Sequence, residues 1–298
     1  MEFTIMQNVG LSGIEIAFRR FGKVSSPPVF LSMGAGAQMI SWPEGFVEEL
    51  VKRDLQIIQF DSRDTGLSTH FTHASIPDFT AAMSGDFSTV SYSLSDMAAD
   101  TIGLMKSLGF ASAHFIGASM GGMVAQTIAI EYPSSAKSLT SIMSTTGNPA
   151  VGQPDYSALA GLGMPPWDDR EAYINWRVKS LKAIGSPDYP FDEKSATNIA
   201  GLSWDRDHDQ HSMTRQALAV LKSGDRTQLL GQLNIPALIL HGASDKMINV
   251  SGGKATAEAI PGSKLVIFEK MGHGLPQPLW VEIVDLIASH VHRADSTS

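Results

Sequence analysis

Residues 114–123 read HFIGASMGGM, a Gly-x-Ser-x-Gly motif centred on Ser119. An apolar run enters the motif, and a helix-forming run, residues 120–131, leaves it. A serine on so sharp a turn adopts strained backbone angles while the neighbouring chain passes close by. Gly117 and Gly121 lack the Cβ atoms that would collide there. The pattern therefore predicts a strand, a tight turn that exposes the Ser119 hydroxyl, and a helix whose positive end lies beside that hydroxyl.

Composition limits the classes of protein that need to be considered. The chain has 298 residues, of which 43% are hydrophobic and 17% charged, a typical globular balance. It contains no cysteine, which excludes a disulfide framework, a thiolate zinc site and a cysteine nucleophile. The net charge of −8 argues against a nucleic-acid partner.

The sequence also gives an expectation about location. The first residues, MEFTI, carry no basic segment followed by a long apolar one, so we expect no signal peptide. No apolar run approaches the length of a membrane span, and we expect no membrane partner. These features together favour the cytoplasm. The sequence does not indicate an oligomeric state.

Strand and helix patterns alternate along most of the chain, which predicts a mostly parallel sheet built from right-handed crossovers. The first two β-rich runs lie close together and predict an antiparallel hairpin. The expected strands are residues 3–9, 14–20, 29–33, 55–60, 113–116, 139–143, 235–242 and 264–268. Residues 70–92 form a connection that is long by the standard of α/β proteins, which suggests a functional or mobile segment.

The alternation stops between residues 147 and 228. This part of the chain shows no convincing strand pattern but helical stretches at 167–184, 192–202 and 212–222. We therefore expect a helical cap (lid) domain, residues 147–228, inserted into an α/β core domain made of residues 1–146 and 229–298.

A serine hydroxyl needs a base within hydrogen-bond reach and a group that orients the base. Asp245 follows the seventh expected strand and His273 follows the eighth, where a parallel sheet presents its ligand-facing loops. Together with Ser119 they give the chain order serine, acid, histidine that this architecture uses. Two other aspartates at a strand end, Asp61 and Asp64, precede the serine and do not fit the order. We predict Asp245 as the acid and His273 as the base.

An oxyanion hole requires two backbone N–H groups aimed at the developing negative charge. One should belong to Met120, directly after the nucleophile. The other should come from the loop after the third expected strand, where Gly34-Ala35-Gly36 stands, and we assign it to Ala35.

Five blocks of sequence carry a resemblance to the α/β-hydrolase superfamily, over nearly the whole chain. They are Met33-Gly34, Ser41-Trp42-Pro43 with Phe46, residues 60–68 (FDSRDTGLS), residues 117–121 (GASMG) and residues 271–276 (MGHGLP). Within that superfamily the chain is most similar to methylesterases that act on anthracycline polyketides. The resemblance implies an eight-stranded sheet flanked by helices. It also implies Ser119 as nucleophile, Asp245 as acid, His273 as general base, and Ala35 and Met120 as oxyanion donors.

The expected function is a carboxylesterase that cleaves a small to medium, mainly uncharged ester through an acyl-enzyme, with no cofactor or metal. The Gly-x-Ser-x-Gly turn carries a serine where related dehalogenases and epoxide hydrolases carry an aspartate nucleophile. This argues against dehalogenase and epoxide hydrolase chemistry. Lactonases and carbon–carbon bond hydrolases use the same triad and remain alternatives. A non-enzyme alternative is a catalytically inactive ligand receptor.

A proline iminopeptidase is a further alternative, because Asp205, Asp207 and Asp209 could bind a substrate amine. An acidic loop that faces water is the simpler interpretation of these residues. The neighbouring His208 and His211 follow no known ligand spacing, so a metal site is disfavoured.

Overall fold

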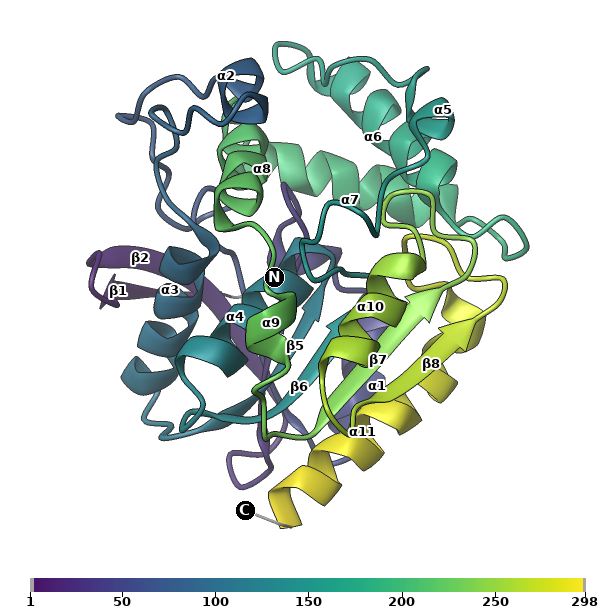
Figure 1. The fold of residues 1–298 in the computed structure, drawn as a ribbon. Helices are drawn as coiled ribbons and strands as arrows, with labels where there is room; N and C mark the ends of the chain where they lie inside the picture. Colours follow the sequence, from purple (N-terminus) through teal and green to yellow (C-terminus); the bar gives the residue numbers. More distant parts are fainter. Residues whose placement is uncertain (1–2, 297–298) are drawn as a thin grey trace.

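The computed structural model describes residues 3–296 and is organised around an eight-stranded sheet with strand order β1-β2-β4-β3-β5-β6-β7-β8 (Figure 1). Strands β1 and β2 form an antiparallel hairpin, β2 pairs antiparallel with β4, and every later pairing is parallel. The mostly parallel sheet predicted from the sequence is confirmed. The strands are β1 (Thr4–Val9), β2 (Ile14–Phe21), β3 (Pro28–Ser32), β4 (Gln56–Phe60), β5 (Ala113–Ala118), β6 (Ala136–Ile142), β7 (Ala237–Gly242) and β8 (Lys264–Phe268).

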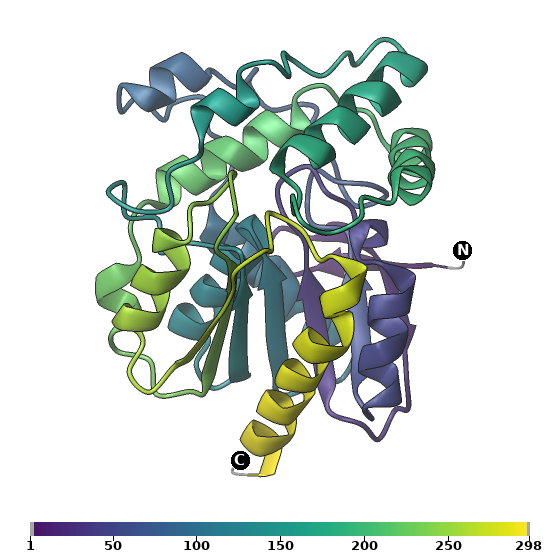
Figure 2. The ribbon, with the colours of Figure 1, turned by 90° about the vertical axis from the view of Figure 1, so that its right-hand side faces the viewer.

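Helices cover both faces of this sheet (Figure 2). One apolar cluster joins β3 and β4 to α1 (Glu44–Lys52) and α11 (Trp280–Ser296). A second joins the opposite face to α3 (Leu94–Ser107), α4 (Met120–Glu131), α9 (Thr227–Leu230) and α10 (Ser251–Ala259). Because both faces are covered, the residues of β4, β5 and β7 are buried throughout, as is typical of parallel strands.

The segment between β6 and β7, residues 147–228, is called here the insertion. Its helices α5 (Tyr156–Leu159), α6 (Arg170–Ile184), α7 (Glu193–Arg206) and α8 (Ser212–Ser223) lie beyond the carboxyl ends of the parallel strands (Figures 1 and 2). The two ends of the insertion meet, because the Arg226 N–H donates to the Thr146 carbonyl oxygen at 2.9 Å. The Arg226 guanidinium, which is buried, also donates to the Thr145 carbonyl oxygen at 3.0 Å.

One helix of the insertion is longer than the sequence pattern indicates. The helix expected at 192–202 continues to Arg206. The long connection 70–92 contains a short helix, α2 (Phe79–Met83), and short 3-10 helices stand at Met39–Ser41 and Gln277–Leu279. Among residues 3–296, no helix combines the length and the apolar character that crossing a membrane demands.

Candidate active site

Ser119 occupies the turn between β5 and α4 with φ 56° and ψ −122°, a backbone conformation that non-glycine residues rarely adopt. A Cβ on Gly117 would lie 1.9 Å from the Gly121 carbonyl oxygen, and one on Gly121 would lie 2.2 Å from the Ser32 carbonyl oxygen. The Ser119 N–H donates to the Ile142 carbonyl oxygen at 2.9 Å. The strained turn and the steric need for both glycines are therefore present as the sequence predicts.

The structure brings Asp245 and His273 together from the loops after β7 and β8. His273 Nδ1 lies 2.8 Å from Asp245 Oδ2, and the other carboxylate oxygen accepts the N–H groups of Met247 and Ile248 at 2.9 Å each. Because a carboxylate only accepts hydrogen bonds, the proton of the neutral His273 ring belongs on Nδ1. Nε2 is then the ring atom that can accept a proton.

Asp245 is held in its charged form. Burial by itself would raise the pKa of Asp245, but hydrogen bonds from His241 and His273 outweigh burial and hold that pKa at about 2. His241 is fully buried, with Nε2 2.8 Å from the Ile248 carbonyl oxygen and 3.5 Å from Asp245 Oδ2. Since both of these neighbours are acceptors, Nε2 carries the proton of His241. A histidine at a strand end forms no motif, and its position in the sequence indicates only packing or a hydrogen bond to the following loop. The contact with the Ile248 carbonyl oxygen is such a bond.

The loops that carry the acid and the base are fixed to each other and to the insertion. The Ser244 N–H donates to the Met271 carbonyl oxygen at 3.0 Å. On the other side, the Gly272 N–H donates to Ser186 Oγ at 2.9 Å, and the His273 N–H donates to the Ile184 carbonyl oxygen at 2.8 Å. The end of α6 therefore supports the backbone of the predicted base.

The loop after β3 borders Ser119, as an oxyanion loop should. A Cβ on Gly34 would lie 3.1 Å from Ser119 Cβ, and the Ala37 N–H closes a turn onto the Gly34 carbonyl oxygen at 3.1 Å. The predicted donor Ala35 lies inside this turn. The other predicted donor, Met120, is the first residue of α4, where backbone N–H groups have no acceptor within the helix.

Two arginines of the insertion form buried ion pairs with the loop after β4. Arg215 of α8 donates two hydrogen bonds of 2.8 Å to Asp64, whose Oδ2 also accepts the Tyr92 hydroxyl at 2.7 Å. Burial beside Asp64 raises the pKa of Tyr92 and keeps that hydroxyl a donor. Arg206 of α7, which is partly exposed, donates a single hydrogen bond to the fully buried Asp61. The two aspartates that do not fit the catalytic order thus anchor the insertion.

The acidic segment of the insertion is only partly exposed to water. Asp205 is exposed and pairs with Arg170 of α6, as expected for a solvated residue. The expectation is wrong for Asp207 and Asp209, whose side chains are 14% and 17% exposed and lie 3.7 Å and 3.9 Å from His70. Burial raises the pKa of Asp207. All three carboxylates have partners within the chain: Arg170 for Asp205, and His70 for both Asp207 and Asp209.

Asp64, His70 and Asp209 lie close enough together to be considered as metal ligands. Arg215, however, donates to both of these carboxylates, so their charge is already balanced by a guanidinium in the same space. His208, one of the two histidines considered for a metal site from the sequence, stacks on Trp204 with 4.5 Å between the ring centroids.

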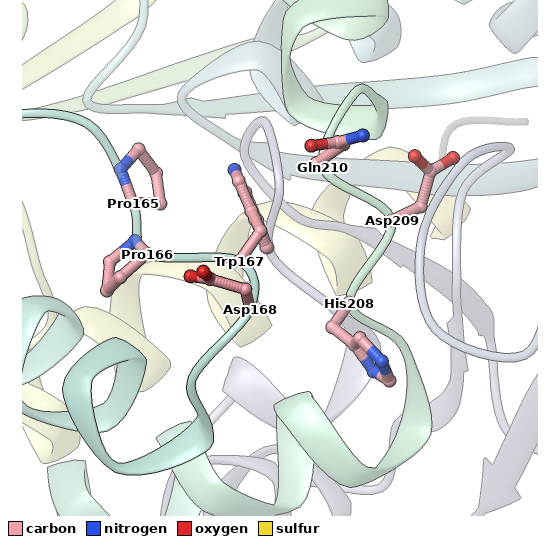
Figure 3. A pocket seen from close by; sticks show the side chains of 7 residues that line it. All are labelled: Pro165, Pro166, Trp167, Asp168, His208, Asp209 and Gln210. Atoms are coloured by element: carbon pink, nitrogen blue, oxygen red, sulfur yellow. The ribbon is translucent and has the colours of Figure 1, made fainter.

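The insertion contains a cavity of about 640 Å³ between two of its segments, residues 165–168 and 208–210 (Figure 3). Trp167 and two prolines supply apolar walls, while Asp168 and Asp209 bring two carboxylates. Trp167 also packs against Tyr173 at a ring distance of 5.1 Å.

Comparison with known proteins defines the family. The family described as alpha/beta hydrolase fold matches residues 27–276. The chain belongs to this family. It is 25% identical to the rhodomycin D methylesterase of Streptomyces peucetius over 300 residues, which cover 92% of this chain and 93% of that protein.

Solved structures agree on the fold. An esterase from Rhodococcus sp. superimposes with a TM-score of 0.75 at 20% identity, covering 98% of this chain and 99% of that one. An enol-lactonase from Burkholderia xenovorans gives a TM-score of 0.68 at 17% identity, covering 99% of this chain and 100% of that one. Taken together, the family and these relatives support carboxylic ester hydrolase activity for the chain.

Proposed function

We propose that this protein is a serine carboxylesterase that cleaves a small to medium, mainly uncharged ester through an acyl-enzyme. The observation that carries the proposal is the 2.8 Å hydrogen bond between His273 and Asp245 at the sheet edge where Ser119 occupies its strained turn. Asp245 and His273, 28 positions apart, come from the loops after two neighbouring strands, and Ser119 follows a third strand more than a hundred positions earlier in the chain.

The proposed reaction begins with attack of Ser119 Oγ on the ester carbonyl carbon. His273 Nε2 takes the serine proton and then gives it to the leaving alkoxide, which departs as the alcohol. A water molecule, deprotonated by the same nitrogen, then hydrolyses the acyl-enzyme and releases the acid. Asp245, charged because its pKa is about 2, stabilises the imidazolium that forms in both steps.

The negative charge that develops on the carbonyl oxygen would be bound by the N–H groups of Ala35 and Met120. Two observations support this assignment of the oxyanion donors: the Gly34–Ala37 turn lies close to Ser119, and Met120 lies in the first turn of α4. The positive end of that helix favours the same charge. No cofactor or metal takes part in this scheme.

The insertion, residues 147–228, would act as the lid domain that selects the substrate. Its cavity has apolar walls from Trp167 and two prolines, and Asp168 is a carboxylate in its lining. We expect such a lining to favour uncharged esters over esters that carry a carboxylate. The methylesterase relative is named for a methyl ester of rhodomycin D, and a methyl ester is one candidate substrate for this chain.

The aminopeptidase alternative loses its main support. It requires free carboxylates for a substrate amine, whereas Asp205, Asp207 and Asp209 face Arg170, His70 and Arg215. Lactone and carbon–carbon bond hydrolysis would use the same residues as ester hydrolysis, so a substrate panel separates them.

The test compares wild type with Ser119→Ala on p-nitrophenyl acetate and butyrate, methyl esters and lactones. Removal of the nucleophile should reduce kcat by roughly 10⁶-fold, to background. Ser157→Ala, at an exposed serine of α5, should behave as wild type. Equal background rates for wild type and Ser119→Ala on the whole panel would refute hydrolase activity and favour the receptor alternative. Preference for anionic esters would refute the substrate class alone.

A further inference from the structure

Gln216 of α8 contacts the oxyanion loop directly. Its side chain is fully buried, and its Oε1 accepts the Gly36 N–H at 2.8 Å. Its Nε2 donates to the Arg63 carbonyl oxygen at 2.8 Å. One side chain of the insertion therefore links the loops after β3 and β4.

The two partners fix the orientation of the Gln216 amide. The Gly36 N–H can only donate and the Arg63 carbonyl oxygen can only accept, so the oxygen and nitrogen of the amide cannot be exchanged. Glutamine is suited to this position because it offers an acceptor and a donor at the same reach. Methionine has a similar length but would leave the Gly36 N–H and the Arg63 carbonyl oxygen without this partner.

The bonded peptide belongs to the turn that contains the predicted oxyanion donor. Gly36 has φ +65°, and a Cβ there would lie 3.0 Å from Met213 Cγ, one helical turn before Gln216. Because a peptide unit is planar, the bond to the Gly36 N–H fixes the whole Ala35–Gly36 unit. The remaining N–H of the turn, that of Ala35, precedes this fixed unit.

The same loop is held again a short distance along the chain. Gln38 Nε2 donates to the Ser203 carbonyl oxygen of α7 at 2.8 Å, and Gln38 Oε1 accepts from Arg206 Nε at 2.8 Å. Two helices of the insertion thus hold the loop between β3 and α1 through buried amides.

We propose that Gln216 is a positioning residue of the oxyanion hole, through which the insertion holds the Gly34–Ala37 turn in its catalytic conformation. The proposal rests on the proposed esterase function. The insertion then contributes to the chemical step as well as to substrate selection. When the hold is lost, the turn samples conformations in which the Ala35 N–H leaves the developing oxyanion, so kcat falls while ground-state binding changes little.

The test measures kcat, KM and the pH profile for Gln216→Met and Gln216→Glu on p-nitrophenyl butyrate. Complete loss of an oxyanion donor costs roughly 10²- to 10³-fold in kcat, so loss of its positioning in Gln216→Met should cost about 10- to 100-fold. KM should change by less than about threefold, and the pH profile should keep its inflection, because His273 and Asp245 are untouched. Gln228→Met, the same change at an exposed position of α9, should match wild type.

Gln216→Glu separates positioning from simple anchoring of α8. Glutamate keeps an acceptor for the Gly36 N–H but directs an oxygen at the Arg63 carbonyl. A positioning role predicts that Gln216→Glu is more active than Gln216→Met even though thermal denaturation finds Gln216→Glu no more stable than Gln216→Met. An anchoring role predicts that activity follows stability, and that result would overturn the proposal.

A folded Gln216→Met with kcat within twofold of wild type would also overturn it. If Gln216→Met does not fold, kcat of Gln216→Glu decides: a loss of less than about fivefold supports the proposal and a larger one refutes it. Failure of the esterase proposal looks different, because wild type itself would then be inactive.

Discussion

Replacement of Asp245 by asparagine tests the proposed catalytic arrangement most directly. The two backbone N–H donors at Oδ1, from Met247 and Ile248, require an oxygen at that position. The asparagine amide oxygen must therefore take the place of Oδ1, and its NH₂ group must take the place of Oδ2, 2.8 Å from His273 Nδ1. Two N–H groups cannot face each other, so His273 has to move its proton to Nε2.

A histidine protonated at Nε2 cannot accept the proton of Ser119. The same exchange of acid for amide in a serine protease triad lowers kcat by roughly 10⁴-fold, because it traps the wrong tautomer. We expect a loss of that order for Asp245→Asn, which is about 5.4 kcal/mol in the activation barrier. The fold should persist, since the shape of the side chain and both bonds to Oδ1 are kept.

The assay is steady-state hydrolysis of p-nitrophenyl butyrate at pH 7–8, with circular dichroism to confirm the fold. The matched control is Asp225→Asn, at an exposed aspartate whose Oδ1 accepts the Thr227 N–H at 2.9 Å. That control should keep wild-type kcat. If Asp245→Asn were folded and retained more than a tenth of wild-type kcat, the tautomer argument and the assignment of the acid would both be wrong.

Two further predictions concern stability. Arg215→Met leaves the buried carboxylate of Asp64 without its cation, so it should lower the free energy of unfolding, measured by urea titration, by roughly 3–5 kcal/mol. The control Arg170→Met removes an exposed pair and should not change this free energy measurably. Equal effects of the two substitutions would contradict the anchoring role of α8. Burial lowers the pKa of His114 and of His290 to about 4, so below pH 6.5 the unfolded chain binds protons that the folded chain does not. Stability should therefore fall by about 2 kcal/mol for each histidine between pH 7.5 and 5, and a flat profile in urea titrations across this range would show that these histidines are not held neutral.

The sheet and the positions of the proposed catalytic residues could be predicted because each has a recognisable signal in the sequence. Gly117 and Gly121 mark a turn that admits no other residue, and the strands of the parallel sheet carry short apolar runs, such as Leu238-Ile239-Leu240 of β7. Asp245 and His273 were found because the carboxyl ends of parallel strands share one edge of the sheet. Their hydrogen bond confirms that these two positions come together, while their catalytic roles stay a prediction.

The residues that join the insertion to the core left no such signal. Gln216 is one glutamine on an amphipathic helix, and its two partners are backbone groups 180 and 153 positions away. Asp64 was set aside because the order of catalytic residues excluded it, yet an arginine 151 positions later neutralises it. Asp209 was expected to face water because charged runs usually do. The partners of Gln216 and Asp64 lie far along the chain, and periodicity relates only the nearest residues. Asp209 contacts the distant His70 as well as Arg215, which is 6 positions later.

The contacts of the insertion also restrict how a substrate can reach Ser119. A rigid swing of the whole insertion would break the buried pairs of Arg206 and Arg215, and the rupture of one such pair costs roughly 3–5 kcal/mol. At 3 kcal/mol the opened form would amount to less than about one molecule in a hundred. The segment before α6 is held differently, by exposed hydrogen bonds such as Trp176 Nε1 to the Gly163 carbonyl oxygen at 3.2 Å. Exposed hydrogen bonds contribute little to the stability of a segment against local opening. We therefore expect that the substrate enters when this segment moves, while α7 and α8 keep the oxyanion loop in place.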